Sequence, residues 1–115
     1  MAERKTRVED YEAIDANHWI KDNAETVAKA KSNHAYVVEY RKSLKALLIL
    51  KAPAEYTTAQ AKESYAYSHP EYIQHLSDIE TAGTESLKLQ FWMKSAEIQF
   101  EHWRTQSAND RKGYQ

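Results

Sequence analysis

Residues 51–58 read KAPAEYTT and hold the one concentrated break in a chain of 115 residues. Pro53 has no amide hydrogen to donate and disfavours the helical conformation of Ala52, so a helix arriving from the amino-terminal side ends near Lys51. The whole chain has only 2 glycines and 2 prolines, and it lacks the alternating runs and Asn-Gly turns that are typical of strands. The fold class that we expect is therefore all-α.

The helix before this break is long. We expect it to run from about residue 16 to residue 51, with Asp15 as its candidate amino-terminal cap. Residues 1–14 are then an amino-terminal arm that forms either a loose segment or a short helix of its own.

Two capping-box patterns follow the break. Thr57 and Gln60 have the spacing at which a hydroxyl accepts from the third amide of a helix, and they predict a short helix over about 58–67. Ser68 and Glu71 repeat this spacing and predict the start of a further helix.

The last helix is expected from Pro70 to about residue 108, because proline is well tolerated in a first turn. Gly83 costs roughly 1 kcal/mol relative to alanine inside a helix but need not end it, and a kink there stays an open question. We expect residues 109–115 to fray. Two helices, each longer than about 50 Å at ~1.5 Å per residue, then form a long antiparallel hairpin with a short connecting helix, a single helical domain over residues 1–115. Such a hairpin encloses little core, so we expect a partner.

Advancing about 100° per residue along the first helix separates two faces. The expected packing face carries apolar and aromatic residues: Ala30, Tyr36, Val37, Tyr40, Leu44, Leu47 and Leu48. The neighbouring arc gathers basic side chains, which are candidates for binding nucleic acid: Lys31, His34, Arg41, Lys42 and Lys45. Tyrosines such as Tyr36 and Tyr40 pack in a core or an interface more often than they stack on bases, and both interpretations are left open.

Charge is divided between two segments. Residues 29–51 carry six Lys or Arg and one Glu, a net charge of +5, whereas residues 54–87 carry one Lys and six Asp or Glu, a net charge of −5. This division indicates either an anion-binding stripe or an intramolecular pairing of the basic with the acidic segment.

The last helix is apolar on two opposed sides. One side carries Leu87, Phe91 and Ile98, and the other carries six residues: Leu89, Trp92, Met93, Ala96, Phe100 and Trp103. A helix of this kind must be covered on both sides, and the first helix covers only one. We therefore expect a homo-oligomer with the six-residue set at its interface, and the competing interpretation is a docking surface for a host protein.

Several classes of function are excluded or disfavoured. The chain has no cysteine, so it forms no disulfide, thiol nucleophile or Cys-ligated metal site. No phosphate-binding loop, dinucleotide fingerprint or nucleophile elbow occurs, and we expect a non-enzymatic protein without cofactors. Glu71, His75 and Asp78 have a spacing that can ligate one ion, but no second matching pair accompanies them, and we expect no metal.

The expected compartment is the cytoplasm. Residues 1–10, MAERKTRVED, lack the apolar region of a signal peptide, and no apolar run reaches the length of a membrane span. We therefore expect no contact with a membrane.

Two runs carry a resemblance to a known family. Residues 76–104, LSDIETAGTESLKLQFWMKSAEIQFEHWR, and the basic residues 39–51, EYRKSLKALLILK, resemble the UvsY-type recombination mediators, which are small all-helical accessory proteins of tailed phages. The resemblance covers about residues 25–108. It implies a ring-forming oligomer that binds single-stranded DNA and helps to load a recombinase while single-strand-binding protein is displaced.

The resemblance also implies roles for individual residues. Lys31, Arg41, Lys42 and Lys45 are implied to contact DNA, and Trp92, Phe100 and Trp103 to lie toward subunit interfaces. The near-neutral composition, with a sequence pI of about 6.5, departs from the basic character that is usual for a DNA-binding protein.

Three functions are therefore compared. The first is an oligomeric phage protein, located in the host cytoplasm, that binds single-stranded DNA as a recombination or replication accessory factor. The second is an inhibitor of a host nuclease or defence complex that acts through acidic residues: Glu55, Glu63, Glu71, Asp78, Glu80 and Glu85. The third is a purely structural coiled-coil or virion component.

Overall fold

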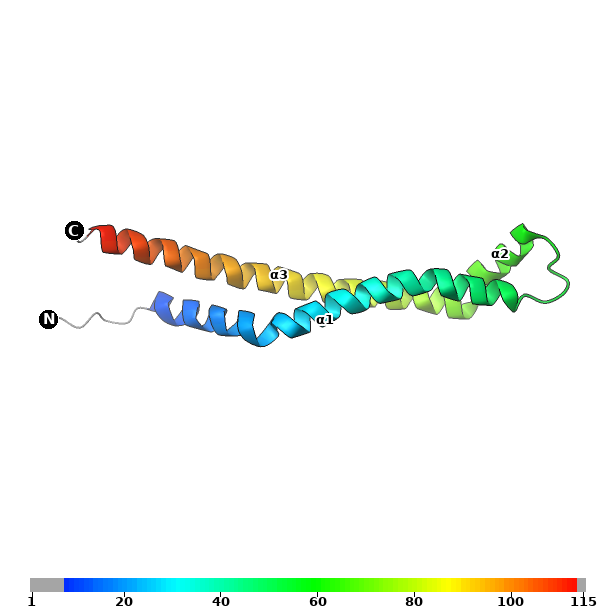
Figure 1. The fold of residues 1–115 in the computed structure, drawn as a ribbon, viewed down its shortest axis with the longest axis horizontal. Helices are drawn as coiled ribbons and strands as arrows, with labels where there is room; N and C mark the ends of the chain where they lie inside the picture. Colours follow the sequence, from blue (N-terminus) through cyan, green and yellow to red (C-terminus); the bar gives the residue numbers. More distant parts are fainter. Residues whose placement is uncertain (1–7, 114–115) are drawn as a thin grey trace. The chain divides into compact units, whose positions relative to one another are not determined.

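The computed structural model describes residues 8–113, which form three helices (Figure 1). They are α1 (Val8–Leu50), α2 (Ala59–Ser68) and α3 (Pro70–Gly113). Within this part of the chain no residue lies in a strand. The predicted all-α class, with two long helices and a short connecting helix, is confirmed.

α1 begins earlier than the sequence predicts. Residues 8–14, which were expected in the amino-terminal arm, continue α1 without a cap at Asp15. Ala13 and Ala16 are buried, with 1% and 6% of their surfaces exposed, so packing stabilises this segment. The remainder of the predicted arm, residues 1–7, lies outside the described residues.

α3 likewise extends past the predicted end at residue 108, to Gly113. Arg111 in this last stretch donates through Nε to the main-chain carbonyl of buried Ser107 at 3.4 Å. Residues 109–113, which were expected to fray, are helical in the structure, and residues 114–115 lie outside the described range.

The break at residues 51–58 is present, but both capping predictions are wrong by one residue. Thr58, not Thr57, caps α2, because its hydroxyl accepts from the amide of Ala61 at 3.0 Å. At α3 the cap is His69, whose Nδ1 accepts from the amide of Glu71 at 3.1 Å. The Ser68 hydroxyl instead donates to the carbonyl of Ser64 at 2.8 Å. Pro70 is the first residue of α3, as predicted.

Tertiary contacts divide the chain into two units. The terminal unit contains the described residues 8–28 of α1 and 88–113 of α3, and the central unit contains residues 29–87. The two are described separately below.

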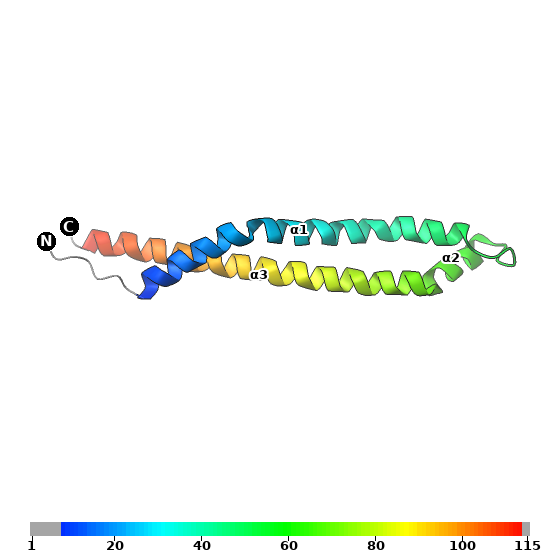
Figure 2. The ribbon, with the colours of Figure 1, turned by 90° about the horizontal axis from the view of Figure 1, so that it is seen from below.

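Within each unit α1 and α3 run antiparallel. In the terminal unit Trp19 contacts Trp92, and a residue earlier on α1, Asp10, bonds to a residue later on α3, Trp103. The same reversal holds in the central unit, where residues 29–50 of α1 and 70–87 of α3 lie side by side (Figure 2). A hairpin connection through residues 51–58 and α2 explains this direction.

The positions that α3 turns inward are spaced alternately by three and four residues. The buried and half-buried members of this series are Tyr72, His75, Ile79, Ala82, Ser86, Leu89, Met93, Ala96, Phe100, Trp103, Ser107 and Asp110. An average spacing of about 3.5 residues is the repeat of a coiled coil. α3 therefore packs as one helix of an antiparallel coiled coil within each unit.

α1 follows the same spacing. Its inward series consists of Ala13, Ala16, Ile20, Asn23, Val27, Ala30, His34, Val37, Leu44 and Leu48, with exposed Arg41 at the intervening position. The predicted packing face is consequently wrong in part. Tyr36, Tyr40 and Leu47 are 67%, 38% and 46% exposed, because they lie beside the inward series rather than in it.

α2 completes the core of the central unit. Ala66 of α2, which is fully buried, packs with Leu44 and Leu48 of α1 and with Tyr72 of α3, and Ile49 lies against this cluster. α2 therefore covers the end of the central unit at which α1 carries Lys45.

Candidate functional site

The five basic residues singled out in the sequence all lie on α1 of the central unit, but they do not form one exposed surface. Lys31, Arg41 and Lys42 are exposed, whereas His34 and Lys45 are half-buried. His34 and Lys45 face neighbouring elements and contribute little to a surface that a polyanion can reach.

The side chain of Lys45 contacts α2. Its Nζ lies 3.3 Å from Oε1 of Glu63 and 4.8 Å from the centre of the Tyr67 ring. A hydrogen bond with the Tyr67 side chain, followed by the interaction with the Glu63 carboxylate, raises the pKa of Lys45 above its ordinary value. An ammonium group that contacts a carboxylate and an aromatic ring is less available to a further anion than a fully exposed lysine.

His34 lies against α3. An added β-carbon at Gly83 would stand 3.1 Å from Nε2 of His34. Gly83 therefore leaves the space that the imidazole fills, and this close approach gives a packing reason for a glycine inside α3.

Lys31, Arg41 and Lys42 remain as the accessible cations among these five residues. Nζ of Lys42 lies 3.4 Å from Oε2 of Glu39, but both side chains are more than 70% exposed, and water screens this pair strongly. A phosphate can therefore compete for Lys42.

Tyr36 and Tyr40 form a stacked pair, with ring centres 6.1 Å apart and an interplanar angle of 16°. Tyr40 also meets the ring of His75 edge-on at 5.4 Å. At about 100° per residue these tyrosines lie on the side of α1 opposite to Lys31 and Lys42. The cationic and aromatic side chains thus do not share one surface, although Tyr36 is exposed enough to stack on a ligand.

The six acidic residues of the alternative hypothesis are all exposed: Glu55, Glu63, Glu71, Asp78, Glu80 and Glu85. Five of them lie on α2 or α3 of the central unit. The pair between Lys45 and Glu63 shows that the basic and acidic segments meet directly at one place.

The spacing of Glu71, His75 and Asp78 does not produce a metal site. Nε2 of buried His75 lies 2.6 Å from the main-chain carbonyl of Val37, while a carboxylate oxygen of Asp78 accepts from Gln74 at 3.0 Å. No group of three or more candidate ligands is brought together anywhere in residues 8–113. None of the helices within residues 8–113 contains an apolar stretch of the kind that a membrane span requires.

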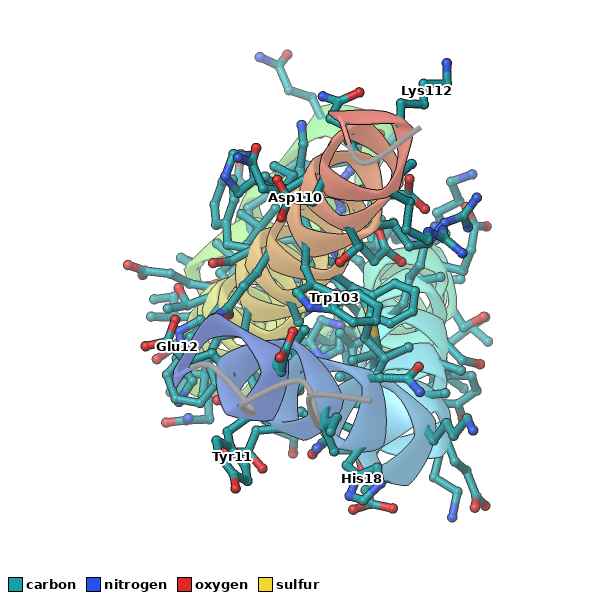
Figure 3. The ribbon with its side chains drawn as sticks, turned by 90° about the vertical axis from the view of Figure 1, so that its left-hand side faces the viewer. Tyr11, Glu12, His18, Trp103, Asp110 and Lys112 are labelled. Carbon is teal, nitrogen blue, oxygen red and sulfur yellow. The ribbon has the colours of Figure 1, made fainter. Side chains whose placement is uncertain are left out.

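The six residues that the sequence assigned to an oligomer interface lie in the terminal unit, and most of them are used within the chain. Leu89 and Ala96 are buried, and Met93, Phe100 and Trp103 are half-buried toward α1. Figure 3 shows Trp103 pointing between α1 and α3, whereas Tyr11 and His18 point away from α3. Of the six, only Trp92, at 55%, keeps most of its surface exposed.

α1 thus covers most of the side of α3 that the sequence assigned to an oligomer interface. Because α1 packs on the side of α3 that carries Ala96 and Phe100, the side left open is the one with Phe91 and Ile98. These two side chains are 67% and 59% exposed. The sequence identified both apolar sides of α3, and α1 covers most of the side that it assigned to an oligomer interface.

Two shallow surface features accompany these side chains in the terminal unit. One is a groove between α1 and α3 at Trp19 and Trp92, whose rings meet at 6.4 Å. The other lies on the outer side of α3 and is lined by Glu97, Ile98, Glu101, His102 and Thr105.

No protein-family model matches this chain, and no curated protein or solved structure matches it either.

Proposed function

We propose that this chain is a non-enzymatic helical protein that self-associates and binds single-stranded nucleic acid, in the manner of a recombination accessory factor of the mediator type. The observation that carries the nucleic-acid part is the exposure of Lys31, Arg41 and Lys42 on α1, in a segment with a net charge of +5. Three cations neutralise only a few phosphates, so a single copy binds weakly. Self-association supplies the multivalency that turns weak sites into useful affinity.

The test is the binding of a fluorescent single-stranded oligonucleotide over a range of salt concentrations. Lys31→Glu combined with Arg41→Glu is expected to weaken binding at low salt by at least about tenfold and to flatten the salt dependence, because each lost contact removes counterion release. Lys45→Met is the matched control. It removes a cation from the same helix, but one that Glu63 already holds, so it leaves binding nearly unchanged. Equal loss in both variants, or no binding by the parent chain, contradicts the proposal.

A second candidate is the inhibition of a host nuclease or defence complex through the acidic surface. It is favoured by the exposure of the six acidic residues, among them Glu71, Asp78 and Glu80 on α3. A target whose basic cleft binds phosphates can bind such an acidic surface through the same electrostatic attraction. In this case Glu71→Gln with Asp78→Asn and Glu80→Gln abolishes inhibition of the nuclease, while Lys31→Glu with Arg41→Glu leaves it intact.

A further inference from the structure

The outer side of α3 in the terminal unit combines a protruding aromatic side chain with a groove. Phe91 is the most exposed large apolar residue described there, at 67%, and Ile98 lies seven residues further along the same helix. A phenyl ring left in water gives up roughly 1.5–3 kcal/mol relative to burial, so a surface of this kind favours an apolar contact.

The groove has the form of a hole between four side chains. Ile98, Glu101, His102 and Thr105, which line it, stand at i, i+3, i+4 and i+7 on α3. This arrangement is the hole into which a partner helix inserts one side chain in knobs-into-holes packing. The hole can therefore accept one side chain of a partner helix. Phe91 projects in this way from the side of α3 that α1 leaves open.

Charge makes this surface complementary to itself. Lys94, Glu97 and Glu101 are exposed and lie within an arc of about 60° on one flank of the outer side, at ~100° per residue. Two such helices can face each other antiparallel across a two-fold axis that passes between them at the level of Ala96. The flank that carries Lys94 in one copy then meets the same flank of the other copy. Lys94 of each copy then stands opposite Glu97 and Glu101 of the other. Glu101 also pairs with Arg104 at 3.3 Å, but both side chains are 63% exposed, so water screens this pair and Lys94 of a second copy can compete for the carboxylate.

A parallel arrangement lacks this complementarity. It would bring the flank that carries Lys94 against the opposite flank, where the neighbouring residues at the same level are Ser95 and Gln99. Neither of these side chains offers a carboxylate, so the charges favour the antiparallel arrangement.

We infer that a second copy of this chain docks on the outer side of α3, antiparallel, with Phe91 of each copy in the hole formed by Ile98, Glu101, His102 and Thr105 of the other. The charge contacts of Lys94 flank this interface and set its direction. This inference rests on the self-association part of the proposed function and identifies the interface. It replaces the interface that the sequence predicted, which α1 covers in part.

Charge exchange tests the inference directly. Lys94→Glu and Glu97→Lys each create like-charge contacts across the two-fold axis, and each is expected to weaken the dimer of the full-length chain by about tenfold. An equimolar mixture of the two variants restores attraction at both contacts. The new carboxylate at position 94 of one chain meets the new ammonium group at position 97 of the other, and parent residues pair at the second contact. The readout is the mass in solution from sedimentation over a broad range of concentrations. A mixture that associates no better than either variant alone overturns the inference.

A second pair of variants tests the apolar part. Phe91→Glu puts a carboxylate into the hole and is expected to weaken the dimer by at least about a hundredfold. Ile14→Glu is the control, since Ile14 is 48% exposed on α1 of the same unit and lies outside the proposed contact. Circular dichroism verifies that both variants remain helical. Equal dissociation in both, or in neither, overturns the inference.

The outcomes also separate this inference from the proposed function. A parent chain that sediments as a monomer removes both the interface and the self-association. A parent oligomer that is insensitive to Phe91→Glu removes the interface alone, and a different surface then joins the copies. Binding of a short oligonucleotide depends on Lys31 and Arg41 and is measured independently.

Discussion

The indole Nε1 of Trp103 donates a hydrogen bond to Oδ1 of Asp10 over 2.6 Å, between two residues that are 93 positions apart in the chain. This bond ties a late turn of α3 to the beginning of α1. An aspartate in this position also interacts favourably with the amino-terminal end of the helix dipole. The contact stabilises the first turns of α1, which is helical from Val8.

Trp103→Phe is expected to lower the free energy of unfolding by about 1–2 kcal/mol, because it removes a hydrogen bond to a charged group and leaves that carboxylate partly buried. The loss should be local, with faster amide hydrogen exchange over residues 10–16 and little change over residues 60–72 of the central unit. Asp10→Asn is the matched control, since an amide oxygen still accepts from the indole and the loss should be smaller. Uniform exchange changes in both units would show that the bond does not act locally.

The helical architecture could be predicted because its determinants are local. Pro53 stops α1, Pro70 begins α3, and nearly every other position lacks a residue that breaks a helix. The cap of α2 was misplaced because Thr57 and Thr58 carry the same hydroxyl, and only the three-dimensional turn decides which one reaches the amide of Ala61.

The sites could be predicted only as sets of residues. Helical spacing placed the basic residues on one arc of α1, but the burial of Lys45 depends on where α2 brings Glu63, and no periodicity contains that information. Similarly, both apolar sides of α3 are visible in the sequence. Which of them α1 covers depends on the packing between the two helices, in which small residues of α1 such as Ala13 and Ala16 are buried.

Gly83→Ala has two effects on the free energy of unfolding, which are opposite in sign and similar in size. Alanine gains about 1 kcal/mol over glycine in a helix interior, while the new β-carbon meets Nε2 of His34 at 3.1 Å. The imidazole is half-buried, and a small displacement of its ring costs about 0.5–1 kcal/mol. We expect a net change in the free energy of unfolding of less than about 0.5 kcal/mol. In a His34→Ala background the same substitution should stabilise by the full ~1 kcal/mol. A double-mutant cycle by urea denaturation measures this coupling, and additive effects would argue against the contact.

His75 is expected to act as a structural donor. It is 7% exposed, and its Nε2 lies 2.6 Å from the carbonyl of Val37, so the ring carries its proton on Nε2. His75→Leu removes this donor and the edge-on contact with Tyr40, and should lower the free energy of unfolding by about 1–2 kcal/mol. His69→Leu serves for comparison, because it removes a helix cap at the start of α3 and a ring contact with Tyr65 but no donor to α1. Thermal unfolding of the two variants compares the costs, and an unchanged midpoint for His75→Leu would contradict this role.

The raised pKa of Lys45 predicts how the free energy of unfolding changes with pH in the alkaline range. Its pKa is raised in the folded chain by the Tyr67 side chain and by Glu63, so folding favours its protonated form. The corresponding stabilisation is fully present below the ordinary value of 10.5 and is lost as the pH rises through the higher folded pKa. The free energy of unfolding of the parent chain should therefore fall above pH 10.5 more steeply than that of Lys45→Met. Tyrosines also titrate in this range, so the informative quantity is the difference between the two curves. Lys42→Met, which removes an exposed lysine from the same helix, should follow the parent curve, and a Lys45→Met curve parallel to both would exclude the linkage.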